Sequence, residues 1–95
     1  MPPDLARSWA RLATAADRAH EQRPLPCRGG SDTPSEKWAS DRESDQLEAA
    51  PECARCPVAL LCRRHGIEFP NEAGPYGGLS ANQRRTLARK RKERP

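Results

Sequence analysis

The sequence contains few large apolar residues. It has eight Leu and one each of Ile, Val and Phe, which is 11 of 95 residues or about 12%. Soluble chains below about 20% in these four residue types are usually disordered. Chains of this size are marginal even at ordinary composition, so we expect no self-sufficient hydrophobic core. An enzyme with a large substrate pocket is therefore excluded, and no small-molecule substrate is expected.

Long hydrophobic runs are also missing from the sequence. No stretch approaches the roughly 18 apolar residues that a membrane span requires. The N-terminal sequence MPPDLARSW lacks a basic region followed by an apolar stretch, so no secretory signal is predicted. We therefore expect a cytoplasmic protein without a membrane partner. Thiols stay reduced in that compartment.

Four cysteines contrast with this shortage of apolar residues. They are Cys27, Cys53, Cys56 and Cys62. A small chain with little core and four cysteines is either a disulfide scaffold or a chain folded around metal. The expected reducing compartment favours metal.

Charge is distributed unevenly along the chain. Residues 79–95 carry a net charge of +6, and residues 1–78 carry −2. A mildly acidic body with a basic tail suggests a polyanionic partner for the tail. The candidate nucleic-acid contacts are Arg84, Arg85, Arg89, Lys90, Arg91, Lys92 and Arg94.

The hydrophobic pattern predicts helices and no convincing strand. A helix is expected over residues 4–22, where one narrow apolar stripe recurs at helical spacing. A second is expected between residues 35 and 50, with Pro51 at its end. The last helix is expected over about 81–93, behind a capping box formed by Ser80 and Gln83. The predicted class is all-α and irregular, with N- and C-terminal segments that are partly flexible.

The spacing C-x25-C-x2-C-x5-C restricts how the thiols can meet. One straight helix cannot direct Cys53 and Cys62 toward one ion, because nine residues place them half a turn out of phase. We therefore expect a break at Cys56–Pro57, with a helix starting at Pro57 and Gly66 just past its end. The positive end of that helix would stabilise thiolates. Cys27 would close the site from a distant loop.

Spacing alone leaves three kinds of site open. Four-cysteine zinc sites usually have two short C-x2–4-C hooks, and here only one exists. Iron–sulfur clusters also take four cysteines, although the bacterial ferredoxin run is absent. A redox disulfide between Cys53 and Cys56 is the third alternative, and it would make the chain an apo-form thiol–disulfide reductase. A zinc-stabilised DNA-binding module is the corresponding zinc alternative.

From Cys27 to the C-terminus the chain resembles the WhiB-like family, actinobacterial iron–sulfur transcription regulators. The resemblance lies in Cys27-Arg28-Gly29, in Cys53-x2-Cys56-Pro57-Val58-x3-Cys62, in the Gly-rich turn 74–78 and in the basic stretch that follows it. The turn departs from the family pattern, since Pro75 and Tyr76 replace an aliphatic residue and Trp. The resemblance implies that the four cysteines bind a [4Fe–4S] cluster.

The resemblance also implies partners. The family binds region 4 of the primary sigma factor of RNA polymerase, through a surface that here comprises Pro75, Tyr76, Gly77 and Gly78. The basic tail would then reach promoter DNA, and the cluster would respond to O2 or nitric oxide. The residues themselves leave Tyr76 open between a partner anchor and a structural cover for the cluster. We expect three segments, which are an N-terminal helix and linker (1–26), a cluster domain (27–79) and a basic helix or tail (80–95).

Overall fold

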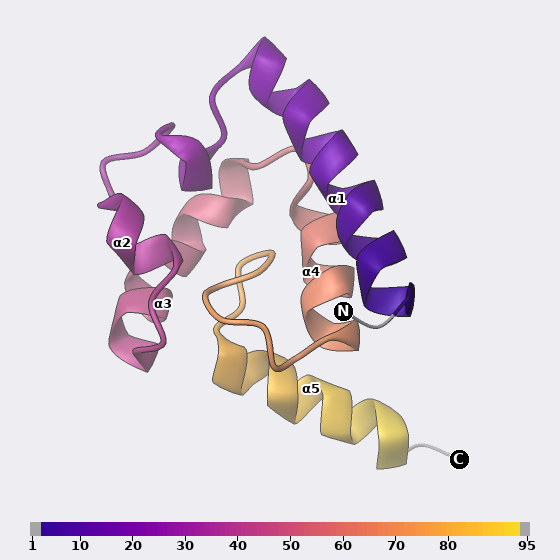
Figure 1. The fold of residues 1–95 in the computed structure, drawn as a ribbon. Helices are drawn as coiled ribbons and strands as arrows, with labels where there is room; N and C mark the ends of the chain where they lie inside the picture. The colour runs from indigo at the N-terminus through magenta and orange to yellow at the C-terminus, as the bar shows by residue number, and fades with distance from the viewer. Residues whose placement is uncertain (1–2, 94–95) are drawn as a thin grey trace.

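The computed structural model describes residues 3–93, and its five α-helices are arranged around a central loop (Figure 1). No strand occurs within residues 3–93, where Tyr76 and Leu79 form an isolated β-bridge, so the predicted all-α class is confirmed. No described helix is long and apolar enough to cross a membrane. The helices are α1 (Pro3–Gln22), α2 (Ser35–Trp38), α3 (Glu43–Ala49), α4 (Ala59–Glu68) and α5 (Ala81–Glu93), with two short 3-10 helices, η1 (Pro26–Arg28) and η2 (Ala50–Arg55).

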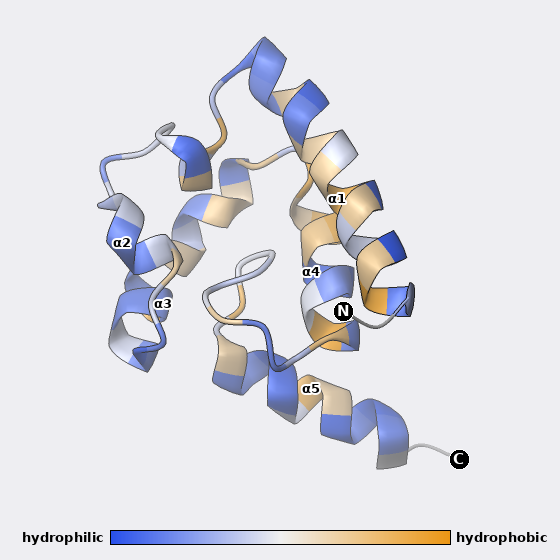
Figure 2. Cartoon of the chain, in the orientation of Figure 1, coloured by the Kyte–Doolittle hydropathy of each residue, from blue (hydrophilic) through white to orange (hydrophobic). Residues whose placement is uncertain are grey.

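Helix α1 follows its predicted bounds closely. It starts at Pro3, a residue type that fits the first turn of a helix because its missing N–H has no partner there. Leu12 and Ala16 lie buried on its apolar side, which packs against α4 (Figure 2). The amphipathic stripe in the sequence therefore does mark the packed face of this helix.

The helix predicted between residues 35 and 50 is divided. The chain forms α2 and α3 within that range, with a bend between them. The hydroxyl of Ser40 accepts the backbone N–H of Arg42 and donates to the Asp45 carboxylate, and the Gln46 amide donates to the Ser40 carbonyl. Side-chain bonds to nearby backbone groups compete in this way with a continuous helix.

The helix predicted to begin at Pro57 starts two residues later and runs past Gly66. The backbone N–H of Ala59 donates to the Cys56 carbonyl, and α4 then continues to Glu68. Gly66 is therefore an interior residue of α4 and not its terminator. A Cβ at position 66 would lie 2.6 Å from both the Arg84 Cδ and the Tyr76 Cβ. Gly66 permits the close approach of two side chains from other segments.

The start of α5 is fixed by local and distant bonds. The Ser80 hydroxyl accepts the Gln83 backbone N–H at 3.2 Å, and the Gln83 side chain accepts the Ser80 N–H at 2.9 Å. This confirms the predicted capping box. The buried Gln46 side chain accepts the Ala81 N–H at 2.7 Å, which ties α3 to the first turn of α5.

Few large apolar side chains form the interior. The buried hydrophobic residues are Leu12, Ala16, Leu25, Ala49, Ala50, Cys53 and Ala81. His65 is also buried, and its ring packs against the rings of Trp9, Phe69 and Tyr76 at centroid distances of 5.3 to 5.6 Å. An aromatic cluster around an imidazole thus joins α1, α4 and the turn, where a larger protein would use aliphatic packing.

The packing of Gly66 predicts the sign of a substitution. In an exposed helix, Gly→Ala stabilises by about 1 kcal/mol. Here Gly66→Ala should destabilise by about 1–3 kcal/mol, because the added methyl overlaps Arg84 and Tyr76. Thermal unfolding of the anaerobically purified protein, followed by circular dichroism, measures the change. Glu68→Ala, at an exposed site of the same helix, is the control and should be near neutral. A Gly66→Ala variant more stable than the parent would contradict this account of the packing.

Candidate metal centre

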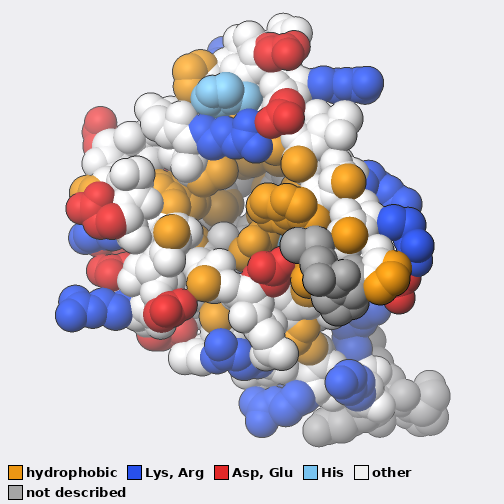
Figure 3. Space-filling view, viewed as in Figure 1, with side chains coloured by type: hydrophobic (Ala, Val, Ile, Leu, Met, Phe, Trp, Pro, Cys, Tyr) orange, Lys and Arg blue, Asp and Glu red, His pale blue; other side chains and the backbone are white. Residues whose placement is uncertain are grey.

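A cavity of about 350 Å3 lies at the centre of the molecule, and all four cysteines line it. Figure 3 shows this cavity as a hollow in the surface, with hydrophobic side chains on its walls. Cys27 belongs to η1, Cys53 to η2, and Cys62 to α4, while Cys56 caps the end of η2. The predicted convergence of four thiols from separate parts of the chain on one space is what the structure displays.

The four thiols differ in exposure, and none is in a disulfide. Cys27 is exposed, Cys53 is buried, and Cys56 and Cys62 are half-buried. Within residues 3–93, no three His, Cys, Asp or Glu side chains have the arrangement of a single-ion site. The four thiols therefore line a cavity and are not arranged around the position of a single ion.

The Gly-rich turn forms one wall of the cavity. Pro75, Tyr76 and Gly77 line it, and Arg63 of α4 donates from its Nε to the Gly77 carbonyl at 2.9 Å. Gly77 has φ +60°, and a Cβ there would overlap the backbone of Arg63. Only glycine fits this contact between turn and helix. The residues predicted to contact a partner thus face inward in part, since Pro75 and Gly77 are buried and Tyr76 and Gly78 are half-buried.

Burial lowers the acidity of Cys27, Cys53 and Cys62. Desolvation raises the pKa of Cys27, of Cys53 and of Cys62, the last to about 12. The neighbouring thiols raise these pKa values further, because nearby thiolates repel. Backbone hydrogen bonds from Gly78 to Cys53 and from Gly77 to Cys62 act in the opposite direction. The expectation that the positive end of a helix stabilises thiolates stays a prediction. Binding of a positively charged centre would favour the deprotonated thiols.

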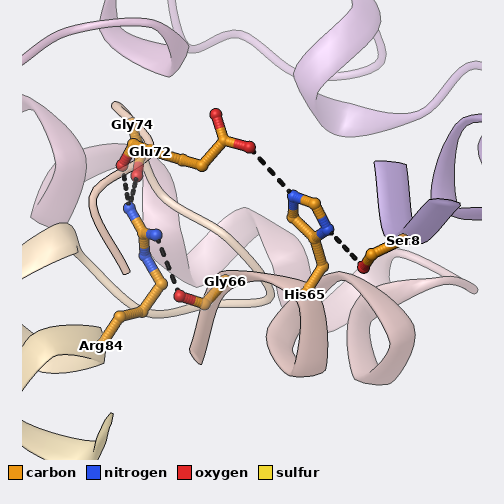
Figure 4. A network of polar contacts seen from close by, with 6 residues as sticks. All are labelled: Ser8, His65, Gly66, Glu72, Gly74 and Arg84. Atoms are coloured by element: carbon orange, nitrogen blue, oxygen red, sulfur yellow. Dashed lines mark hydrogen bonds and ion pairs between the residues drawn. The ribbon is translucent and has the colours of Figure 1, made fainter. Parts of the chain in front are cut away.

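Behind the turn lies a network of buried polar groups (Figure 4). The Ser8 hydroxyl and His65 Nδ1 are 2.8 Å apart, and His65 Nε2 lies 3.2 Å from the Glu72 carboxylate. Arg84 donates to the backbone carbonyls of Gly66, Glu72 and Gly74. Its guanidinium also lies over the Tyr76 ring, 4.8 Å from the centroid. The network joins α1, α4, α5 and the turn, and it was not predicted from the sequence.

The prediction that Arg84 contacts nucleic acid is wrong. Its side chain is fully buried because it fills the space that Gly66 leaves and bonds the turn from inside. The other described members of the basic set are exposed on α5, which lies at the bottom of Figure 3, where basic side chains gather. They are Arg85, Arg89, Lys90, Arg91 and Lys92. Arg94 lies outside the described residues.

The part of the chain that forms this centre is similar to known proteins. Residues 14–87, which include all four cysteines and the turn, match the family described as transcription factor WhiB. The chain is similar to the redox- and pH-responsive transcriptional regulator WhiB3 of Mycobacterium tuberculosis H37Rv, with 39% identity over 46 residues. The redox-responsive transcriptional regulator WhiB3 of Mycobacterium bovis matches equally well.

The matches to individual proteins cover only parts of them. The matched stretch is 48% of this chain and 45% of each relative, so it spans less than half the length of the curated relatives. No solved structure matches the chain significantly. The family match, by contrast, extends over most of the chain and contains every residue of the thiol-lined cavity except Trp9, Leu12 and Ala13. The chain belongs to the WhiB family of transcription factors.

Proposed function

We propose that the chain is a transcriptional regulator built around a [4Fe–4S] cluster held by Cys27, Cys53, Cys56 and Cys62. It acts in the cytoplasm by docking on region 4 of the primary sigma factor of RNA polymerase, and α5 contacts promoter DNA. The observation that carries the proposal is the meeting of four thiols from separate segments in one cavity. The family and the redox-responsive names of its relatives support a regulator rather than an enzyme.

The cavity fits a cluster in size and in chemistry. Its volume of about 350 Å3 far exceeds the roughly 10–15 Å3 that a cavity needs to hold one water, which favours a cluster over a single zinc ion. Four thiols are the ligand set that [4Fe–4S] clusters take. Trp38 also lines the cavity, and its buried indole N–H finds no acceptor among the described residues. A sulfur-rich cluster would supply an acceptor as well as the charge that the thiols require. When bound, it supplies one-electron chemistry and sensitivity to O2 or nitric oxide.

The first test concerns the cluster. Each of four single variants should lose iron and sulfide, because each removes one of only four ligands. The variants are Cys27→Ser, Cys53→Ser, Cys56→Ser and Cys62→Ser. Anaerobic absorption spectra with iron and sulfide analysis measure the loss. Ser35→Ala, in the wall of the same cavity, is the matched control and should retain the cluster.

The same variants distinguish the alternatives. A thiol–disulfide reductase would need Cys53 and Cys56 and would tolerate loss of Cys27 or Cys62. A colourless protein with bound zinc would identify the zinc-stabilised DNA-binding module and contradict the cluster.

The proposed docking surface is the Gly-rich turn from Pro75 to Gly78, where Tyr76 and Gly78 are partly exposed and Pro75 and Gly77 are buried. Tyr76 is half-buried, held between His65 and Arg84, so little side-chain entropy remains to be lost on binding. A rigid, partly exposed aromatic side chain is a suitable anchor for a protein partner. Burial raises the pKa of Tyr76 to about 12, so its hydroxyl is neutral at physiological pH.

The second test concerns this anchor. Tyr76→Ala should weaken binding to sigma-factor region 4 by about 2 kcal/mol, or roughly 30-fold in Kd, with iron content unchanged. Calorimetry under anaerobic conditions measures Kd, and Tyr76→Phe, which keeps the ring, should bind nearly as well as the parent. Loss of iron from Tyr76→Ala would assign Tyr76 a structural role and remove it from the docking surface.

The proposed DNA contact is the exposed basic strip on α5. Five described basic side chains point to solvent over two turns, and phosphate contacts from such a strip give affinity without sequence choice. Docking on the sigma factor raises the effective concentration of the strip near DNA, so modest affinity suffices. Arg84 takes no part, because it is buried.

The third test neutralises the strip and leaves Arg84 in place. Replacing Arg85, Arg89, Lys90, Arg91 and Lys92 with Gln should preserve iron and sigma-factor binding and weaken DNA binding of the complex. The slope of log affinity against log salt should become shallower by about 0.9 for each phosphate that the variant no longer neutralises. The control replaces the exposed Arg11, Arg18 and Arg23 with Gln, which should leave the slope unchanged. An unchanged slope in the α5 variant would show that the strip does not bind DNA.

A further inference from the structure

Arg84 presents an electrostatic problem that the proposed function does not address. It is fully buried, and burial lowers the pKa of its guanidinium without bringing it near neutrality, since arginine stays protonated in proteins. Among the side chains that the structure describes, no carboxylate forms an ion pair with it, and the nearby Glu72 carboxylate faces His65. Three carbonyl bonds and the face of the Tyr76 ring compensate this charge in part. A negative group nearby would stabilise it further.

Arg84 contacts three backbone carbonyls beside the cavity and one residue of its wall, Tyr76. It donates to the Gly74 carbonyl at 2.6 Å, to the Glu72 carbonyl at 2.7 Å and to the Gly66 carbonyl at 3.2 Å. Its cation lies over one face of Tyr76, whose side chain lines the thiol cavity. The Cys62 thiol lies within electrostatic range of the guanidinium. One of the three carbonyl bonds is to Gly74 of the turn, and the guanidinium contacts Tyr76, which also lines the cavity.

We propose, resting on the cluster of the proposed function, that Arg84 is a positioning residue that locks the Gly-rich turn and supplies the buried positive charge balancing the cluster. A [4Fe–4S] cluster with four thiolates carries net negative charge, which is the partner that Arg84 lacks among the side chains. Net charge and hydrogen bonds around the sulfurs set the reduction potential of such clusters. The charge at position 84 therefore makes the cluster easier to reduce.

Reduction of the cluster takes one electron from an external donor. In a mediated titration, one electron passes from an external low-potential reductant, such as dithionite, to the cluster. The cluster becomes one unit more negative, and Arg84 neither gains nor loses a proton. A fixed cation nearby stabilises the reduced state more than the oxidised state.

Three variants of the cluster-loaded full chain test the inference. Arg84→Gln removes the charge, and its midpoint potential should shift to more negative values than that of the parent. Arg84→Lys keeps the charge and should stay close to the parent, although it cannot reproduce all three carbonyl bonds. Arg64→Gln, an exposed site on α4 with the same change in charge, should leave the potential unchanged because solvent screens it. Anaerobic spectroelectrochemistry measures the midpoint.

Hydrogen exchange of the loaded protein tests the lock separately from the charge. The amides of Gly77 and Gly78 should exchange faster in both Arg84 variants than in Arg64→Gln. If Arg84→Gln does not retain a cluster, Arg84→Lys provides the test, because it should retain iron and keep nearly the midpoint potential of the parent. Equal potentials in parent and Arg84→Gln, or equal shifts in the Gln and Lys variants, would overturn the electrostatic role. A parent chain without iron would instead refute the proposed function.

Discussion

The structure depends on one constraint, which is that a thiol-lined cavity occupies the place of a hydrophobic core. Leu12 and Leu25 are the only buried Leu, Ile, Val or Phe side chains within residues 3–93. The elements are instead arranged around the four cysteines, whose burial raises the pKa of three of them. A positive centre bound in the cavity, as in the proposed function, would stabilise the thiolates. Folding and ligand binding would then be coupled.

The polar side chains of the interior compensate for the small apolar core. His65, Gln46, Ser80 and Arg84 are all buried, and each bonds a segment distant in sequence or closes a helix end. Buried polar groups hold a fold together when their bonds are satisfied and cost free energy when they are not. This explains how a chain with about 12% large aliphatic and Phe residues can have defined helix ends and a defined turn.

The sequence predicted features that depend on neighbouring residues. The bounds of α1 and α5 and the Ser80–Gln83 capping box follow from local patterns, and the convergence of the thiols follows from helical phase. The bend after α2 and the continuation of α4 through Gly66 were not predicted, because tertiary contacts decide both. Glycine alone does not say whether it ends a helix or admits a neighbour.

The charge pattern of the sequence did not reveal that Arg84 is buried. Seven Lys and Arg residues in a short stretch suggest a uniformly exposed basic surface. One signal was present: Arg84 is the fourth residue after the Ser80 cap, a position that commonly packs against the residue before the cap. Arg84 and Arg85 are adjacent, yet a helix rotates each residue by about 100° from the last, so one enters the interior and the other faces water. The phase between Ser80 and Arg84 is therefore fixed by the carbonyls that Arg84 binds, and an insertion there would turn the arginine out of the protein. Arg89, Lys90, Arg91 and Lys92 are exposed, so a change of sequence there would disturb the centre less than an insertion before Arg84.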